Sequence, residues 1–416
     1  MELKRVVVTG LGAITPLGNT VESYWDGLVK GKSAAGPITR FDATNFKTKF
    51  ACEVKDFNAE EYLDRKEVRK TDLFAQYAIA AAEQAFQDSG LDLEKIDLDE
   101  AGVIWGAGIG GIITFMDEVK AYVQGNGVPR FNPFFIPKMI SDIASGHISM
   151  KYGFRGPNYG TVSACASSTH AIGDAFNLIR LGKAKVFITG GSEAAINEAG
   201  VGGFNALQAL STRNDDPATA SRPFDKDRDG FVIGEGGGAL ILEEYEYAVS
   251  RGAHIYCEIV GCGMTADAYH LTAPHPEGLG ARKVMGATLK DGNIEPSDVD
   301  YINVHGTSTP LGDVAEIKAI KEVFGEHAYK LNISSTKSMT GHLLGGTGAI
   351  EAIACILAIK NGIVPPTINN FNLDPELDTK LNFTLNKAQE RKVRVAISNT
   401  FGFGGHNACV AFKSLE

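Results

Sequence analysis

Two segments of the chain follow the same order of strand, sharp turn and apolar helix, and each carries one chemically reactive side chain at its turn. In residues 161–179, small and β-branched residues run into Cys165, and apolar residues then recur at helical spacing. In residues 332–362, a short apolar strand leads through a turn to His342 and then to a helix of small and aliphatic residues. Helices this apolar are buried ones. We therefore predict an α/β protein built from a duplicated unit, with the two helices facing each other at the centre.

A restart of the pattern near residue 257 predicts where the two units meet. Residues 258–261 repeat the strand and glycine found at residues 6–10. With 416 residues, the chain is long enough for two fused halves. We predict an N-terminal half at residues 1–256, which carries the reactive cysteine, and a C-terminal half at residues 257–416, which carries two candidate histidines.

Composition narrows the class of protein. A net charge of −10 argues against broad nucleic-acid binding. The six cysteines are scattered, which favours neither a disulfide framework nor a cysteine metal site. The sequence opens directly on a strand-like run without a signal peptide, and no run of about 18 apolar residues is evident. We expect a cytoplasmic protein that interacts with neither nucleic acid nor membrane.

Two stretches resemble known ligand motifs without completing them. Residues 106–111 fit the dinucleotide pattern GxGxxG, but no acidic residue follows about 20 positions later. We interpret these glycines, together with Gly10 and Gly12, as turns beside a cavity. Residues 225–236 begin like a calcium loop, but the twelfth position is Gly236 instead of glutamate. We therefore predict neither a dinucleotide site nor a calcium site.

Cys165 stands near the start of its predicted helix and is a candidate nucleophile. The partial positive charge of a helix N-terminus favours the thiolate, so we expect a lowered pKa. A buried structural cysteine is the alternative. A nucleophilic cysteine needs a base or a cation and donors for an oxyanion. His305 and His342 both follow strands at turns, and the convergence of these three turns favours a catalytic site over three structural residues.

Four motifs carry a specific resemblance. They are VSACASS around Cys165, VHGTSTPLGD at residues 304–313, STKSMTGHLLGGTGAIE at residues 335–351 and SNTFGFGGHNA at residues 398–408. In this order the chain resembles the β-ketoacyl-acyl-carrier-protein synthases of type II, the elongating condensing enzymes of fatty acid synthesis. The resemblance implies the thiolase fold, with two five-stranded α/β halves in layers αβαβα, and a homodimer.

The same resemblance implies an acyltransferase and assigns its catalytic residues. Cys165 matches the nucleophile that accepts the acyl group. His305 and His342 match the histidines that handle malonyl decarboxylation, and Lys337 matches the lysine that orders their pocket. Phe401 matches the gating phenylalanine, whose backbone N–H joins that of Cys165 in the oxyanion hole. No cofactor is implied, because phosphopantetheine arrives on the acyl carrier protein.

Further positions match binding residues of the family, and for each a purely structural role is the alternative. The pantetheine, pocket and mobile-loop positions are Thr307, Thr309, Ile109, Phe204, Asp267 and Pro274. A group that binds a monovalent cation in some relatives is matched by Asn303, Glu351, Ser398 and Asn399.

A basic group before the first long helix is our candidate docking surface for the acidic carrier protein. It comprises Lys66, Arg69 and Lys70, together with Arg130. The alternative is a solvated basic face. Gln208 stands where the nearest relatives carry an arginine that touches the carrier, which puts the docking footprint in doubt but not the chemistry.

Other condensing enzymes are alternative interpretations. A thiolase has a second catalytic cysteine in a C-terminal glycine loop, but residues 401–406 contain none. A type III relative carries asparagine in place of His342. A ketosynthase of a polyketide or other secondary-metabolite pathway shares the same reactive residues. A non-catalytic chain-length partner subunit lacks the nucleophile, so Cys165 argues against it.

Overall fold

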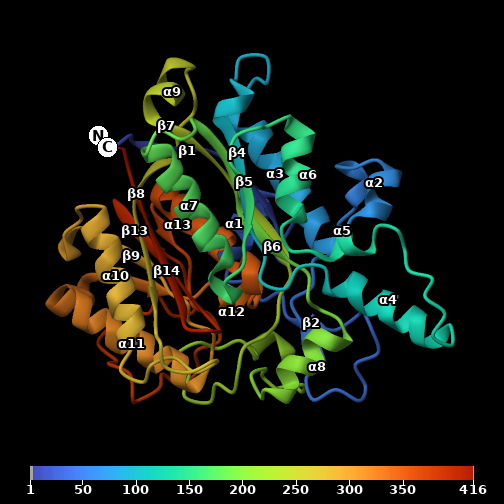
Figure 1. The fold of residues 1–416 in the computed structure, drawn as a ribbon. Helices are drawn as coiled ribbons and strands as arrows, with labels where there is room; N and C mark the ends of the chain where they lie inside the picture. The colour runs from blue at the N-terminus through green and yellow to red at the C-terminus, as the bar shows by residue number, and fades with distance from the viewer. Residues whose placement is uncertain (1–2, 416) are drawn as a thin grey trace.

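The computed structural model describes residues 3–415, and ten strands of this part of the chain form one mixed sheet (Figure 1). In order across the sheet they are β10 (Asn332–Ser334), β9 (Tyr301–Asn303), β13 (Val395–Gly402), β14 (His406–Lys413), β8 (Cys257–Ala266), β1 (Val6–Ile14), β7 (Gly236–Glu244), β6 (Val186–Glu193), β4 (Ala101–Gly106) and β5 (Asn158–Thr161). Two short pairs lie apart from it: β2 (Gly36–Pro37) with β3 (Phe50–Ala51), and β11 (Ile363–Val364) with β12 (Gln389–Glu390).

Some of the α-helices cover the outer faces of this sheet, and two of them lie between its two halves. They are α1 (Val21–Val29), α2 (Arg65–Lys70), α3 (Leu73–Ser89), α4 (Ile112–Gln124), α5 (Phe135–Met139), α6 (Ile143–Tyr152), α7 (Ser167–Arg180), α8 (Glu198–Ala206), α9 (Tyr245–Ser250), α10 (Leu279–Asp291), α11 (Pro310–Phe324), α12 (Lys337–Thr340) and α13 (Thr347–Asn361). Their ends follow local chemistry: the Asp72 side chain accepts the Phe74 N–H at the start of α3, and Gly90 and Gly362 end α3 and α13 in the left-handed conformation.

The strand order is symmetric about the junction of β1 with β8. These strands pair antiparallel, with Val6 opposite Ile259. Moving outward on either side, the next two pairings are antiparallel and the last two are parallel. Each half therefore contributes five strands in the same arrangement. The prediction of a duplicated α/β unit is confirmed.

Three separate apolar clusters produce the layers. One fills the space around α7 and α13 between the two halves of the sheet. A second lies under α3 and α6 on the outer face of the N-terminal half, and a third lies under α10 and α11 on the outer face of the C-terminal half. Side chains alternate between clusters along each strand, as in β14, where Val410 faces the centre while Cys409 and Ala411 face outward. The result is helix, sheet, helix, sheet, helix.

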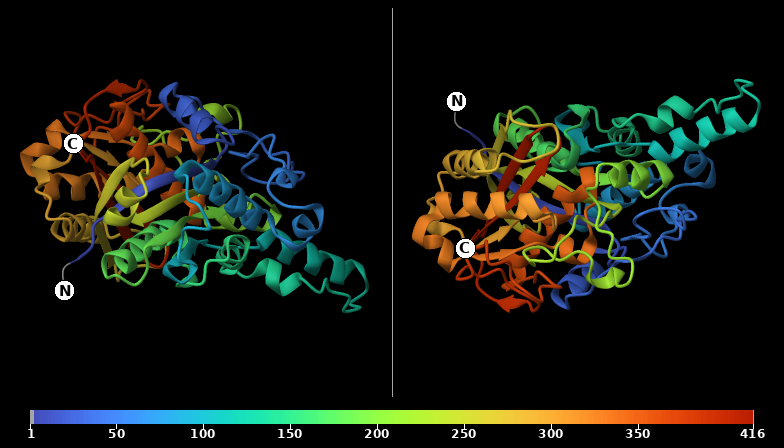
Figure 2. Two further views of the ribbon diagram at one scale, coloured as in Figure 1. Left: turned by 90° about the horizontal axis from the view of Figure 1, so that it is seen from above. Right: turned by 90° about the horizontal axis from the view of Figure 1, so that it is seen from below.

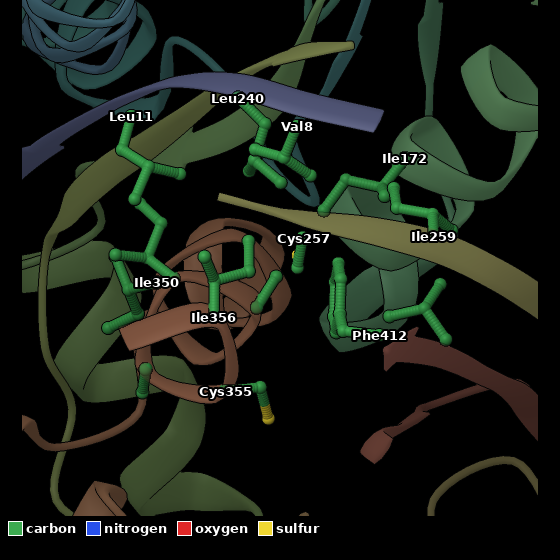
Figure 3. Close-up of a cluster of buried hydrophobic side chains, with 14 of the residues drawn as sticks. Val8, Leu11, Ile172, Leu240, Cys257, Ile259, Ile350, Cys355, Ile356 and Phe412 are labelled. Atoms are coloured by element: carbon green, nitrogen blue, oxygen red, sulfur yellow. The ribbon is translucent and has the colours of Figure 1, made fainter. Parts of the chain in front are cut away.

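The central cluster shows how the halves are joined (Figure 3). Val8 and Leu240 from the front half and Ile259 and Phe412 from the back half lie around Ile356 of α13. All five side chains are at most 1% exposed. Because α13 is buried from Thr347 to Ala358 and α7 packs one face into the same cluster, both turns that precede these helices are held in fixed positions at the middle of the molecule.

The glycines of β1 have a different role from the one expected. Gly10 and Gly12 lie inside β1 and do not end it. A Cβ at Gly10 would lie 2.1 Å from the Ala85 carbonyl oxygen, and one at Gly12 would lie 2.0 Å from that of Ala81. The interpretation of these two as turns was wrong, because they let the backbone of α3 pack directly on the strand.

One stretch has the length and composition of a membrane span. It covers residues 344–361, with a mean hydropathy of 1.2, and 83% of it is buried inside the protein. Glu351 and Lys360 interrupt it, so it is not an unbroken apolar run, and its burial makes it the central helix of the core. Among residues 3–415 no second helix meets the same criteria.

Candidate active site

Cys165 lies at a sharp turn between β5 and α7. Ala164 adopts a left-handed φ of 50°, and a short 3-10 turn, Ala164–Ala166, leads directly into the helix. The Ser167 hydroxyl fixes this turn, because it accepts the Ser163 N–H and donates to the Ala164 carbonyl. The predicted order of strand, turn and helix is confirmed. Cys165 is 9% exposed at the base of a cavity.

His342 reaches Cys165 from the other half of the molecule. It follows α12 in the chain. Its backbone N–H donates to the Val232 carbonyl and its carbonyl accepts the Gly234 N–H, which holds it against the front half. Its Nε2 lies 3.0 Å from the Cys165 sulfur, and its Nδ1 lies 2.9 Å from the Thr347 hydroxyl. The structure therefore places a sulfur of the front half and an imidazole of the back half in direct contact.

His305 completes the group. Its ring centroid lies 5.3 Å from that of His342, with the two planes nearly perpendicular. The buried Glu316 carboxylate accepts the N–H groups of His305 and Gly306, both at 2.9 Å. This fixes the backbone that carries the ring. Both imidazoles line the same cavity as Cys165.

Burial decides the protonation of these groups. It raises the pKa of the Cys165 thiol to about 12, against the effects of the Lys337 ammonium and two backbone N–H groups. The expectation of a lowered thiol pKa is wrong, because desolvation exceeds the local positive charge. Burial and the charge of Lys337 hold the pKa of His342 and of His305 well below its usual value. At neutral pH the resting site holds a thiol beside two neutral imidazoles.

The backbone N–H groups that lie at the Cys165 sulfur are not the expected pair. The N–H groups that contact the Cys165 sulfur are those of Cys165 and Phe403. Phe401 is still paired with Asn407 in the ladder between β13 and β14, whereas Phe403 lies in the turn beyond it. The assignment of this N–H to Phe401 was wrong. The Phe401 ring instead lies tilted against that of His305, at 5.5 Å between centroids and 55° between planes.

Lys337 is buried beside the two histidines and pairs with Glu351 of α13 at 2.5 Å. Among the described residues, Asn303, Glu351, Ser398 and Asn399 each have a buried side-chain oxygen without a hydrogen-bond partner. Asn303 and Ser398 face each other on β9 and β13, on which α13 packs. Burial raises the pKa of Glu351 to about 7, while Lys337 lowers it. Orphaned oxygens with one carboxylate suit a small monovalent cation.

The cavity has a volume of about 520 Å³ and is lined by residues from both halves. Six of the residues predicted to bind substrate contribute to its wall: Ile109, Phe204, Asp267, Pro274, Thr307 and Thr309. The hydroxyls of Thr307 and Thr309 lie 3.0 Å apart in its wall, and Gln208 also lines it. A chamber of this size accommodates a flexible chain that ends at Cys165.

Glu193 is a site residue that the sequence did not single out. It is fully buried at the end of β6, and its carboxylate accepts the backbone N–H groups of Gly108, Ile109, Gly110 and Gly345 at 2.8–3.1 Å. These bonds tie the cavity wall of the front half to the turn after His342. A glutamate directly after the buried run VFITGGS was the available signal.

The predicted docking residues lie on one side of the molecule. Lys66 and Arg69 are exposed on α2, and Arg130 is exposed in the loop after α4. Lys70 is half-buried, binds Glu67 at 2.7 Å and lies 5.5 Å over the Phe134 ring. That contact brings α2 against the segment that follows Arg130 in the chain.

A thiol, a neutral imidazole in contact with it and a second imidazole, held where two α/β halves meet, define a condensing enzyme of the thiolase fold. Models of the N-terminal and C-terminal domains of beta-ketoacyl synthase match residues 3–248 and 256–371. The chain belongs to the beta-ketoacyl synthase family.

Individual relatives agree over the full length. A 3-oxoacyl-[acyl-carrier-protein] synthase 2 of Synechocystis is 54% identical over 100% of this chain and 99% of its own. A beta-ketoacyl synthase from Burkholderia phymatum has a TM-score of 0.92 at 35% identity, with 99% of this chain and 100% of that chain covered. A type II polyketide ketosynthase, solved with its acyl-carrier protein, has a TM-score of 0.90 at 34% identity, with both chains fully covered.

Proposed function

We propose that this chain catalyses the decarboxylative condensation of an acyl group with malonyl-acyl-carrier protein in fatty acid elongation, releasing CO₂ and 3-oxoacyl-acyl-carrier protein. The contact of 3.0 Å between Cys165 Sγ and His342 Nε2 carries this proposal, because it pairs a nucleophile with a base in a chamber shaped for a chain. The names of relatives at 50–54% identity support fatty acid synthesis over a polyketide pathway, whose ketosynthase is 34% identical.

The first half-reaction loads Cys165. His342 Nε2 accepts the thiol proton as the sulfur attacks the carbonyl carbon of the acyl thioester. The N–H groups of Cys165 and Phe403 hold the negative oxygen that forms. The carbon–sulfur bond of the carrier then breaks, and the leaving sulfur takes the proton back from His342. The acyl group remains on Cys165, which gives ping-pong kinetics.

The second half-reaction forms the carbon–carbon bond. Loss of CO₂ from the malonyl thioester leaves its electron pair as an enolate, whose oxygen is stabilised by N–H groups of His305 and His342. Their lowered pKa suits this role, because neutral donors do not protonate the carbanion. The enolate carbon attacks the acyl-cysteine, and the Cys165 sulfur leaves and regains a proton from solvent.

Mass spectrometry with acyl- and malonyl-carrier protein tests this chemistry. The expected products are an acyl-enzyme intermediate and a 3-oxoacyl carrier lengthened by two carbons. Cys165→Ala removes the nucleophile and is expected to abolish acylation, whereas Cys262→Ala, a cysteine on β8 away from the cavity, leaves it intact. Covalent acylation that survives Cys165→Ala contradicts the assignment.

We propose that an acidic carrier protein docks on the basic surface formed by Lys66, Arg69, Lys70 and Arg130. A solved relative in complex with its carrier supports a partner of this kind, and exposed like charges favour an acidic partner. Lys66→Glu with Arg69→Glu is expected to raise KM for the carrier substrate most strongly at low salt, with kcat little changed. Lys183→Glu on another exposed loop is the control. An unchanged KM at low salt rejects this surface.

We also propose a homodimer in which β5 pairs with the β5 of a second copy. β5 is an edge strand whose residues are exposed or half-exposed, and Val162 beside it is 62% exposed. Figure 2 shows the α4 segment extending from the body of the molecule, and its exposed Phe115 and Val123 are apolar side chains that a second copy would bury. Light scattering is expected to give twice the chain mass. Val162→Asp is expected to give the monomer, whereas Val249→Asp on α9 is not. A monomeric unmodified protein rejects the proposal.

We propose that the orphaned oxygens of Asn303, Glu351, Ser398 and Asn399 hold a monovalent cation that stabilises the lysine pair behind the histidines. The melting temperature is expected to be higher in KCl or NaCl than in choline chloride at equal ionic strength. Ser398→Ala is expected to reduce that difference. Equal melting temperatures in all three salts count against the site.

We infer that the protein works in the cytoplasm. Its one helix of membrane-span composition is buried in the core, which leaves no apolar span for a bilayer within residues 3–415. Cell fractionation is expected to recover the protein with the soluble fraction, and recovery with membranes after a salt wash contradicts this.

A further inference from the structure

The Thr347 hydroxyl lies behind the imidazole that contacts Cys165. It stands 2.9 Å from His342 Nδ1, on the side of the ring opposite the sulfur. Thr347 is 1% exposed at the first position of α13, and it does not line the cavity. The residue before the helix is Gly346, which has no side chain to cap it. The Thr347 hydroxyl is directed at His342 Nδ1.

The two half-reactions require the hydrogen of the neutral His342 ring on different nitrogens. In acylation, Nε2 accepts the thiol proton, so in the neutral ring the hydrogen is on Nδ1. In decarboxylation, Nε2 donates an N–H to the enolate oxygen, so the hydrogen is on Nε2 and Nδ1 is an acceptor. A neutral imidazole has one donor and one acceptor nitrogen, and a threonine hydroxyl can act as either partner.

We propose that Thr347 is a positioning residue that supports both neutral tautomers of His342. It accepts from Nδ1–H while the thiol is free, and it donates to Nδ1 once Cys165 is acylated. The exchange moves one proton off Nδ1 and one onto Nε2 through solvent, with no net change of charge. Phe231 packs edge-on against the ring at 5.3 Å between centroids, so the ring is held while its hydrogen moves. This inference rests on the proposed condensation.

A pair of substitutions separates the hydrogen bond from packing. Thr347→Val keeps the shape and removes the hydroxyl, which leaves a buried ring nitrogen without a partner. We expect kcat for both half-reactions to fall about tenfold, which corresponds to about 1.4 kcal/mol, with KM for the carrier substrates unchanged. Thr347→Ser restores the hydroxyl and is expected to restore kcat. Rates for Thr347→Val within twofold of the unmodified protein, or no rescue by serine, overturn the proposal.

A measurement on the unmodified protein keeps the test independent of how the valine variant folds. Nitrogen-15 NMR of labelled histidine distinguishes the two tautomers. Resting enzyme is expected to carry the His342 hydrogen on Nδ1, and enzyme acylated on Cys165 is expected to carry it on Nε2. The same tautomer in both states overturns the proposal. An unmodified enzyme that forms no acyl intermediate counts instead against the proposed function.

Discussion

At Cys165, burial and local charge act in opposite directions. The thiol is desolvated below the cavity, which raises its pKa, while Lys337 and the N–H groups of Cys165 and Phe403 lower it. The net effect is a pKa near 12. A thiol in this state needs a base at the moment of attack, and His342 Nε2 at 3.0 Å supplies one without forming a stable ion pair in advance.

Alkylation by iodoacetamide tests this balance, because only the thiolate reacts. Below the thiol pKa the thiolate fraction rises with pH. We expect the rate of Cys165 alkylation to keep rising from pH 7 to pH 9.5, with no inflection in the acidic range. The Cys165→Ala variant sets the background from the other cysteines. A rate that levels off with a midpoint below pH 7 shows a preformed thiolate–imidazolium pair and contradicts the high pKa.

The sequence predicted the reactive residues better than their electrostatics. Cys165, His305 and His342 could be found because each stands at a turn after a strand, inside a specific motif. The direction of the thiol pKa could not be found, because desolvation depends on everything packed around the sulfur. The choice between Phe401 and Phe403 depended on where β13 ends, and strand ends are set by pairing partners distant in sequence.

Among the elements, the end of β6 connects the loop after β4 to the turn after His342 through Glu193. Its carboxylate accepts an N–H from each of residues 108–110 and from Gly345. Gly108 and Ile109 line the cavity, and Gly345 follows His342 in the chain. One side chain therefore sets the spacing between the chamber and the base.

We expect Glu193→Gln to loosen this connection. An amide offers one acceptor oxygen, and its NH₂ group faces N–H donors, so at least one buried donor loses its partner, at about 1–3 kcal/mol. The melting temperature should fall, and acylation by long acyl thioesters should slow more than acylation by short ones. Glu94→Gln, an exposed glutamate, is the control. Equal stability and an unchanged chain-length profile contradict this role for Glu193.

The order of strands and helices was predictable because the spacing of apolar residues and the position of glycines at segment ends are local signals. The strand–turn–helix order at Cys165 came from them directly, whereas at His342 the short helix α12 lies within the predicted turn. What β1 packs against was not predictable, since the close approach of α3 to Gly10 and Gly12 is a contact between distant segments. The role of Glu193 was not predicted, because a single glutamate forms no recognisable motif. Only the fold brings four backbone N–H groups to its carboxylate.

At the scale of the whole molecule, the active site exists only where the halves meet. The duplication was predictable from two apolar helices in similar positions, but the pairing of β1 with β8 and the symmetric strand order needed the structure. Since α7 and α13 share a single apolar cluster with both halves of the sheet, neither half buries its central helix alone.

This shared core leads us to expect one cooperative unfolding transition. Ile353 on α13 is fully buried in the central cluster, and Ile353→Ala creates a cavity that should lower the free energy of unfolding by about 2–5 kcal/mol. Both tryptophans, Trp25 and Trp105, lie in the front half, so their fluorescence reports on that half, while far-UV circular dichroism reports on all helices and strands. We expect Ile353→Ala to shift both signals to the same lower temperature. Val249→Ala on exposed α9 should shift neither. If tryptophan fluorescence and circular dichroism separate into two transitions, the halves are independent folding units and the central helices do not couple them.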